Sequence, residues 1–257
     1  MIWKRSKWRM CVAVILSLLM LLTPTLAGYA ASEFLGQTNS LSYQELNGPE
    51  LDQLAQKTID NEGVQRLVEH LAGKEAYLAG KRAAKWQFDG HEGDFVLLNY
   101  KGKEDVQIIF GESGGKVKVG AGVFKVTDKK IQIEAYDLVD GKTYHSSTIT
   151  FLKDVNGKFG QPSVKWHSSP LMKNPKTIGS PPDISVAATN CDICKNICYY
   201  IYAGGCGVSS YLVCNGACIP FGTWTCPIIC GIVWGIICLY GGGTSCPTLC
   251  QIAGFCP

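Results

Sequence analysis

The residues whose chemistry is most evident are cysteines, and nearly all of them lie at one end of the chain. Of the 13 cysteines in 257 residues, 12 fall between Cys191 and Cys256. An even number in so short a segment predicts a disulfide framework formed in an oxidising compartment. The predicted disulfide residues are Cys191, Cys194, Cys198, Cys206, Cys214, Cys218, Cys226, Cys230, Cys238, Cys246, Cys250 and Cys256. We refer to residues 191–257 as the cysteine module.

The spacing of these cysteines predicts short helices. From Cys194 to Cys250 they are separated by four residues or by multiples of four. Residues four apart lie on one face of a helix, so each C-x3-C pair presents two sulfurs to the same neighbour. Glycines and prolines interrupt the run and divide it into four expected helices. These are residues 192–203, 208–218, 226–239 and 246–253.

The cysteine pattern is also symmetric about Gly222. In an antiparallel helical hairpin this symmetry allows nested bonds, with Cys214–Cys230 and Cys218–Cys226 as the expected inner pairs. The symmetry relates the outer cysteines in the same way, although 12 cysteines allow roughly ten thousand connectivities. The outer mirror pairs are Cys206 with Cys238, Cys198 with Cys246, Cys194 with Cys250, and Cys191 with Cys256 as a near-mirror.

A metal centre is an alternative use of cysteine. Zinc and iron–sulfur sites are typically built from repeated C-x2-C pairs or include histidine. Only Cys191 and Cys194 have that spacing, and all 4 histidines lie upstream of the module. We therefore expect no metal and no cofactor.

The module is apolar as well as rich in cysteine. From Asn196 to Pro257 it has no charged side chain, so it should aggregate or enter membranes unless disulfides hold it compact. We expect some apolar side chains to stay exposed and to contact a target-cell membrane or an envelope receptor. These are Trp224, Ile228, Ile229, Val233, Trp234 and Ile237. A transmembrane hairpin over residues 217–240 is an alternative that Pro220 and Pro227 disfavour, whereas interfacial insertion stays open.

The other end of the chain has the features of a secretory signal peptide. Within the first ten residues 4 are basic, and an apolar run over residues 11–22 and then small residues follow. This order predicts a signal peptide over residues 1–30, cleaved after Ala30 or Ala27, and a secreted protein. An uncleaved anchor is the alternative. Lipidation of Cys11 is disfavoured because this cysteine begins the apolar run.

Residues 31–176 are expected to form a soluble α+β domain that folds without cysteine. Apolar residues at helical spacing predict a helix over residues 50–74, broken into two near Asn61 and Gly63. Period-two runs separated by glycine-containing turns then predict an antiparallel meander of five or six strands. The runs are residues 85–89, 94–100, 105–110, 116–127, 130–137 and 143–152. The expected fold is thus two-part, an α+β domain and a small, mainly helical, disulfide-rich module.

Residues 177–190 separate the two parts. They include Pro181 and Pro182 and have no periodicity, which indicates an exposed linker of the kind that proteases cut. Since the composition changes completely after it, we expect a processing site and a processing protease. A tether that stays intact is the alternative.

Enzyme and nucleic-acid functions find little support in the sequence. There is no G-x-S-x-G elbow, no H-E-x-x-H and no phosphate-binding loop, so we expect no catalytic residues. We interpret as strand turns, and not as a dinucleotide fingerprint, the glycines Gly111, Gly114, Gly115, Gly120 and Gly122. The first 30 residues carry a net charge of +4, and the whole chain carries +3, so the remaining residues carry about −1. A near-neutral chain has no broad basic surface for nucleic acid.

This layout resembles a known family. A secreted precursor with a soluble N-terminal domain and an uncharged, cysteine-dense C-terminal peptide is similar to the halocin C-eight-type microhalocins and to related bacteriocins encoded in bacteria. The matching residues are Asp183-Ile184, Cys191 and Cys194 followed by Lys195, and the closing Gly254-Phe255-Cys256, over about a quarter of the chain. The resemblance implies that the C-terminal peptide is released as an antimicrobial and that the N-terminal part is the immunity protein that sequesters it.

We therefore expect the secreted precursor of a disulfide-rich antimicrobial peptide, whose N-terminal domain shields the peptide or gives immunity. One alternative is a secreted or surface structural protein that is anchored or cross-linked by its cysteine module. An enzyme is the other.

Overall fold

The computed structural model describes most of the chain beyond its first 40 residues. The described residues are 41–153, 162–167, 169–171, 191, 194–195, 198–199, 201, 205–218, 226–240, 246–252, 254 and 256, with the side chains at 217, 218 and 226 excepted. The expected signal peptide and linker therefore lie outside them. Asn39–Pro257 forms one compact unit.

Two helices stand near the start of the described chain, α2 (Gly48–Ile59) and α3 (Glu62–Leu71). Asn61 separates them, since its side chain accepts hydrogen bonds from the backbone N–H groups of Gly63 and Val64 at 2.9 and 3.3 Å. This is the N-cap arrangement that starts a new helix. The predicted pair of helices with a break at Asn61 is confirmed.

The described strands form one antiparallel sheet in which each strand lies beside its neighbour in sequence. They are β1 (Ser42–Glu45), β2 (Tyr77–Phe88), β3 (His91–Lys101), β4 (Asp105–Ser113), β5 (Lys116–Val126), β6 (Lys130–Val139), β7 (Lys142–Leu152) and β8 (Ser163–Trp166). Tight turns with positive φ, as at Asp89-Gly90 and Asp140-Gly141, connect neighbouring strands. Such turns match the twist of a hairpin.

The predicted meander is confirmed, but the number and lengths of its strands were wrong. The sheet has eight strands in the described residues, not five or six, and β2 begins at Tyr77 where the sequence suggested residue 85. The two missed strands, β1 and β8, lie at the sheet edges and have only four residues each. All of β1 is exposed, so it lacks the alternating burial that marks a strand in a sequence.

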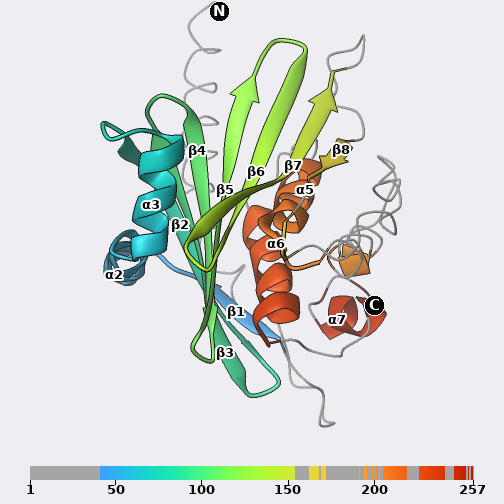
Figure 1. Ribbon diagram of the computed structural model, residues 1–257. Coiled ribbons are helices and arrows are strands. Elements are labelled where there is room, and N and C mark those ends of the chain that lie inside the picture. The colour runs from blue at the N-terminus through green and yellow to red at the C-terminus, as the bar shows by residue number, and fades with distance from the viewer. Residues whose placement is uncertain are drawn as a thin grey trace, which may run out of the picture. The chain divides into compact units, whose positions relative to one another are not determined.

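The two faces of the sheet are covered by different parts of the chain (Figure 1). Helices α2 and α3 cover one face, and the buried side chains there form what we call the helix-side core. It includes Leu54, Leu67, Val96, Leu98, Ile108, Phe110 and Ala121. Because successive residues of a strand point to opposite faces, Phe95 and Leu97 face the other way, toward the cysteine module.

The module contributes helices α5 (Val208–Cys218), α6 (Cys226–Gly235) and α7 (Cys246–Ile252), and a short π-helix η3 (Ile236–Tyr240). Each described residue from 191 to 201 is also helical. The mainly helical character is confirmed. The expected single helix over residues 226–239 was wrong in detail, since its hydrogen bonding changes from α to π at Ile236.

The sheet and the module share one hydrophobic core. Helix α5 lies against β5, β6 and β7, and α6 lies against β2, β3 and β4. What we call the module-side core joins strand residues such as Trp86, Phe95, Ile109, Ile133 and Phe151 to Tyr211, Leu212 and Trp234 of the module. The separate domain predicted for residues 31–176 therefore stays a prediction, and in the intact chain its second face is not free.

Candidate functional site

Within the described residues, five disulfides join the two arms of the module in nested order. They are Cys191–Cys256, Cys194–Cys250, Cys198–Cys246, Cys206–Cys238 and Cys214–Cys230. Their sequence separations fall from 65 to 16 residues, so each bond lies inside the one before it. The partners predicted by the symmetry about Gly222 are confirmed for these five pairs. Cys218 and Cys226 have side chains outside the described part of the chain.

The residues expected to contact a target lie in this nested hairpin and against the sheet. Trp234 and Ile228 each keep only 1 % of their surface exposed, and Val233 and Ile237 are also buried. Ile229 is partly buried against the same core, and Trp224 lies outside the described residues. In the intact chain the sheet and the rest of the module enclose these four buried side chains, whereas their expected exposure concerns the module on its own. Their contact with a target stays a prediction.

Glycines on the module helices bring aromatic rings of the sheet close to the helix backbone. A β-carbon at Gly216 would lie 2.0 Å from the Phe151 ring, and one at Gly231 would lie 2.1 Å from the Phe95 ring. Real β-carbons do not approach other atoms so closely. The two phenylalanines of the sheet are thus seated on α5 and α6 where only glycine leaves room.

The converse arrangement occurs on the sheet. A β-carbon at Gly111 would lie 2.8 Å from the Trp234 ring, and β-carbons at Gly120 and Gly122 would lie 2.6 Å from Val208 and 2.9 Å from Leu212. These glycines were interpreted as strand turns, which was wrong, since they lie inside β4 and β5, whereas Gly114 and Gly115 do form the turn between those strands. They provide room for side chains of α5 and α6, so each surface has recesses that match the other.

A buried carboxylate of the sheet ties down the start of α5. Asp137 of β6 is 1 % exposed, and its Oδ1 accepts a hydrogen bond from the backbone N–H of Val208 at 2.6 Å. The hydroxyl of Ser169 donates to Oδ2 of the same carboxylate at 2.8 Å. Burial raises the pKa of Asp137 above its ordinary value, whereas these hydrogen bonds lower it. Asp137 therefore supplies the capping acceptor that α5 lacks in its own sequence.

Further polar contacts join the two parts. The hydroxyl of Ser209 on α5 lies 2.8 Å from that of Ser146 and 2.9 Å from that of Ser147 on β7. The amide of Asn215 donates to Gln107 of β4 at 3.1 Å. Buried polar groups are costly unless paired, so these contacts favour one docked position over others that would bury the same apolar area.

Among the described residues, two buried polar atoms at this contact have no hydrogen-bond partner, Nε1 of Trp86 and the hydroxyl of Tyr211. Tyr211 is fully buried beside Phe95, with ring centroids 5.4 Å apart, and burial raises its pKa. The indole of Trp86 lies close to Gly235 of α6. Both rings are thus held by packing against the partner surface.

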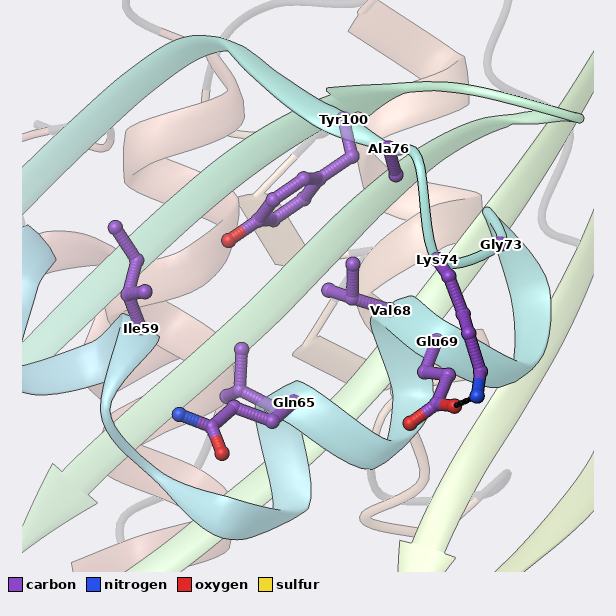
Figure 2. A pocket seen from close by; sticks show the side chains of 9 residues that line it. Ile59, Gln65, Val68, Glu69, Gly73, Lys74, Ala76 and Tyr100 are labelled. Carbon is purple, nitrogen blue, oxygen red and sulfur yellow. Dashed lines mark ion pairs between the residues drawn. The ribbon is translucent and has the colours of Figure 1, made fainter.

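A second candidate site is a hollow of about 350 Å³ between α2, α3 and β3 (Figure 2). Ile59, Val68 and Tyr100 form an apolar wall, and burial raises the pKa of Tyr100. At its rim Lys74 pairs with Glu69 at 3.3 Å. The hollow offers an apolar surface with one ion pair.

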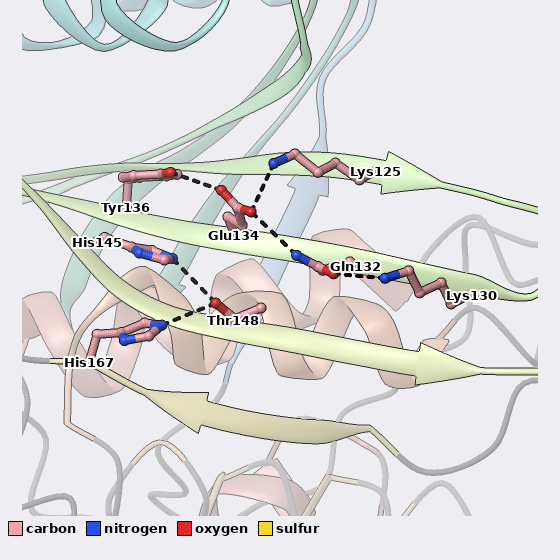
Figure 3. A network of polar contacts seen from close by, with 8 residues as sticks. All are labelled: Lys125, Lys130, Gln132, Glu134, Tyr136, His145, Thr148 and His167. Carbon is pink, nitrogen blue, oxygen red and sulfur yellow. Dashed lines mark hydrogen bonds and ion pairs between the residues drawn. The ribbon is translucent and has the colours of Figure 1, made fainter.

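A third candidate is a polar network on the face of the sheet that α2 and α3 partly cover (Figure 3). The rings of Tyr136, His145 and His167 form a row with centroids 4.9 and 4.2 Å apart. Thr148 Oγ1 lies 3.4 Å from Nε2 of His145 and 3.1 Å from Nε2 of His167. Burial and the neighbouring His145 lower the pKa of His167.

Beside this row, a carboxylate meets a cation and a phenol. Glu134 accepts hydrogen bonds from Lys125 at 2.9 Å and from the Tyr136 hydroxyl at 3.0 Å. The bond from Lys125 holds the pKa of Glu134 below its usual range, and burial with the bond to Glu134 raises that of Tyr136 to about 12. Over the described residues, no three His, Cys, Asp or Glu side chains are placed to hold a metal ion.

Comparison of the chain with protein-family models, with curated proteins and with solved structures gives no match. Of the helices that the structure describes, none is both long and apolar enough to cross a membrane. The five disulfides indicate formation in an oxidising environment.

The resemblance implied that the N-terminal part sequesters the module, but the sequence analysis missed the residues that form the contact between the two parts. Its determinants are Asp137, Phe95, Phe151 and the glycines that face them. One signal was available: glycines recur inside the apolar helices, at Gly216, Gly231 and Gly235, where they lower helix propensity. Such glycines indicate a close approach of another element.

Proposed function

We propose that the chain is the secreted precursor of a hydrophobic, disulfide-stapled antimicrobial peptide, in which the sheet masks the apolar helices of the cysteine module. The observation that carries the proposal is the burial of α6 against the sheet, with Trp234 at 1 % exposure in a segment without a charged residue. Released from the sheet, such a helix would present a large apolar surface, and surfaces of this kind bind membranes or other proteins.

The disulfides support the same role. Five nested bonds hold the module in a compact hairpin, and both cysteines of each bond belong to the module itself. An apolar peptide separated from its covering surface needs such bonds to keep its shape, and each contributes about 2–4 kcal/mol. The resemblance to the halocin C-eight-type peptides is in line with this division, with the sheet part in the masking or immunity role.

Under this proposal the partners are a processing protease, a target-cell membrane or envelope receptor, and the sheet itself. The role is one of binding and release, without catalysis, a cofactor or nucleic acid. Since the described module carries Lys195 as its one basic side chain, attraction of a cationic peptide to anionic lipid is not its mechanism. Apolar insertion or a specific receptor has to supply the affinity.

Mass spectrometry of the culture medium tests the processing step. The proposal expects a discrete, fully oxidised peptide that begins near Cys191. The purified peptide should inhibit growth in a panel of bacteria and archaea or release dye from liposomes, and the intact precursor should do neither. An oxidised peptide that is inactive in both assays rejects the antimicrobial role.

A matched pair of substitutions tests the apolar helix. Trp234→Lys places a charge on the face that the sheet buries, and should abolish the activity of the released peptide. Tyr199→Lys adds the same charge at a side chain that is already 54 % exposed, and should retain activity. A peptide map must show the same disulfides in both variants, so that the comparison reports the surface and not misfolding.

A second candidate function is a secreted or surface structural protein that works as an intact chain. It is favoured by the compactness of Asn39–Pro257 and by the core that the sheet and the module share. The two candidates differ in the product found in the medium, because the structural role expects an uncut chain after signal removal.

A further inference from the structure

The contact between the sheet and the module has the composition of a protein interior. Large strand residues such as Trp86, Phe95 and Phe151 lie in one cluster with Tyr211, Leu212 and Trp234 of the module. All six are buried, with 2 % exposure at most. Contacts of this kind, which resemble a domain core cut in half, are found between chains that stay permanently associated.

Within one chain, covalent connection keeps the two parts near each other. A short flexible linker acts as an effective concentration in the millimolar range. Any contact that is tighter than micromolar therefore survives loss of the linker at micromolar protein. The core-like packing and the buried polar contacts around Asp137 and Ser209 are features of tight association.

We propose that cutting the chain between the sheet and the module does not release the module, and that the two fragments remain a noncovalent one-to-one complex keyed by Phe151 on Gly216 and Phe95 on Gly231. This inference rests on the proposed function in one respect, that the linker is cut in nature. The sheet is then a binding partner for its own module, and release is a second event that requires a competing apolar surface.

Gly216 and Gly231, which we call the glycine seats because a phenylalanine ring packs directly on each, make the complex selective for this module. A module with any larger residue at Gly216 or Gly231 meets a phenylalanine ring at about 2 Å, and neither ring is at the flexible end of an exposed side chain. In the free module the same change is favourable, since alanine has a higher helix propensity than glycine. Glycine at these positions is therefore explained by docking and not by the stability of the module itself.

The test uses the full chain with a specific protease site inserted after Gly179, cut to completion. Native mass spectrometry at micromolar concentration should show both fragments in one 1:1 complex. Separate fragments, or a module that precipitates and leaves the sheet fragment in solution, overturn the proposal. Because the cut is engineered, this result stands whether or not the natural chain is processed or antimicrobial.

A matched set of variants tests the glycine seats. Isotope-labelled and unlabelled cut complexes are mixed, and the appearance of mixed complexes measures dissociation. Gly216→Ala and Gly231→Ala should speed dissociation about tenfold or more, as overpacking of a core does. Gly80→Ala is the control, because a β-carbon there would meet Asn99 at an ordinary 3.6 Å. Dissociation of all three variants at the wild-type rate rejects the seats as determinants.

Discussion

The two faces of the sheet are covered by helices that differ in origin and in the way they pack. Helices α2 and α3 adjoin the sheet in sequence and fill the helix-side core mainly with aliphatic side chains, with a close approach at Gly63, where a β-carbon would lie 2.5 Å from Leu138. The module reaches the other face from beyond residue 190, and its helices approach so closely that glycines are needed on both surfaces. A neighbouring helix returns to its face through a short connection, whereas a distant module needs matched shape and buried polar contacts to find one position.

The helix pair and the module also differ in what stabilises them. The α2–α3 pair is amphipathic and held by its core and by the Asn61 cap. The module has no charged side chain from Asn196 to Pro257 and is held by disulfides. One cover is therefore held by its core and a helix cap, and the other carries its own covalent cross-links.

Reduction should have the largest effect and should separate the two faces. With each bridge contributing about 2–4 kcal/mol, full reduction is expected to unfold the module and leave the module-side core open. Amides of α2 and α3 should stay protected from hydrogen exchange, because the described helix-side core has no cysteine. Equal loss of protection on both faces would show that the sheet depends on the module for its fold.

A time course with dilute reductant refines this prediction. Cys191–Cys256 has partly exposed residues at both ends, whereas Cys198 and Cys246 are 0 % and 2 % exposed. Exchange requires access of a thiolate to the sulfur, so the outer bond should open first. Alkylation followed by peptide mapping gives the order, and early labelling of Cys198 contradicts it.

A pair of core substitutions compares the faces directly. Phe95 and Phe110 are both buried, on neighbouring strands and opposite faces. Phe95→Ala and Phe110→Ala should each lower the free energy of unfolding by about 3–5 kcal/mol. Local hydrogen exchange should differ, rising in α5 and α6 for the first and in α2 and α3 for the second. Identical exchange patterns would mean that the two cores open together.

Much of the fold could be predicted from patterns within short stretches. The break at Asn61, the strand alternation in β3 to β7 and the nested cysteine pairs all depend on residues whose spacing is visible in the sequence. The edge strands β1 and β8 could not be predicted in this way. Each has four mostly exposed residues, which form a strand only because β2 or β7 lies beside them.

The candidate site was harder to predict because it is made by residues far apart in sequence. Asp137 looks like one more polar residue of an alternating strand, and its partners Ser169 and Val208 come 32 and 71 residues later. Trp234 and Ile228 were expected to be exposed because a small module cannot bury them alone. For the released module that expectation stays a prediction, and in the whole chain the sheet supplies the surface that buries these side chains.

Asp137 should have an intermediate effect, and it depends on pH. Because burial raises its pKa in the folded protein, protonation favours folding: its contribution is greatest below the ordinary value of 3.8 and is lost as pH rises through the folded pKa. Asp137→Asn, neutral throughout, should therefore gain stability relative to wild type as pH rises. Denaturant titrations between pH 3 and 8 measure this, and a constant difference contradicts it.

Asp137→Ala separates the charge from the hydrogen bond. Relative to Asp137→Asn, it leaves the buried N–H of Val208 without its acceptor, which should cost about 1–3 kcal/mol at every pH. The loss should appear as faster exchange at the start of α5, with α2 and α3 unchanged.

The smallest predicted effect is at the cap of α3, on the face that lacks the module. Asn61→Ala removes the acceptor for Gly63 and Val64 and should cost about 1 kcal/mol of stability. Asn47 provides a matched control within the same helix pair, because it is the N-cap residue of α2 but makes no side-chain capping bond, so Asn47→Ala should be nearly neutral. Denaturant midpoints measure both, and the engineered cut complex should dissociate at the wild-type rate in each. If Asn61→Ala speeds that dissociation, strain passes through the sheet from one face to the other, and the two covers are not independent.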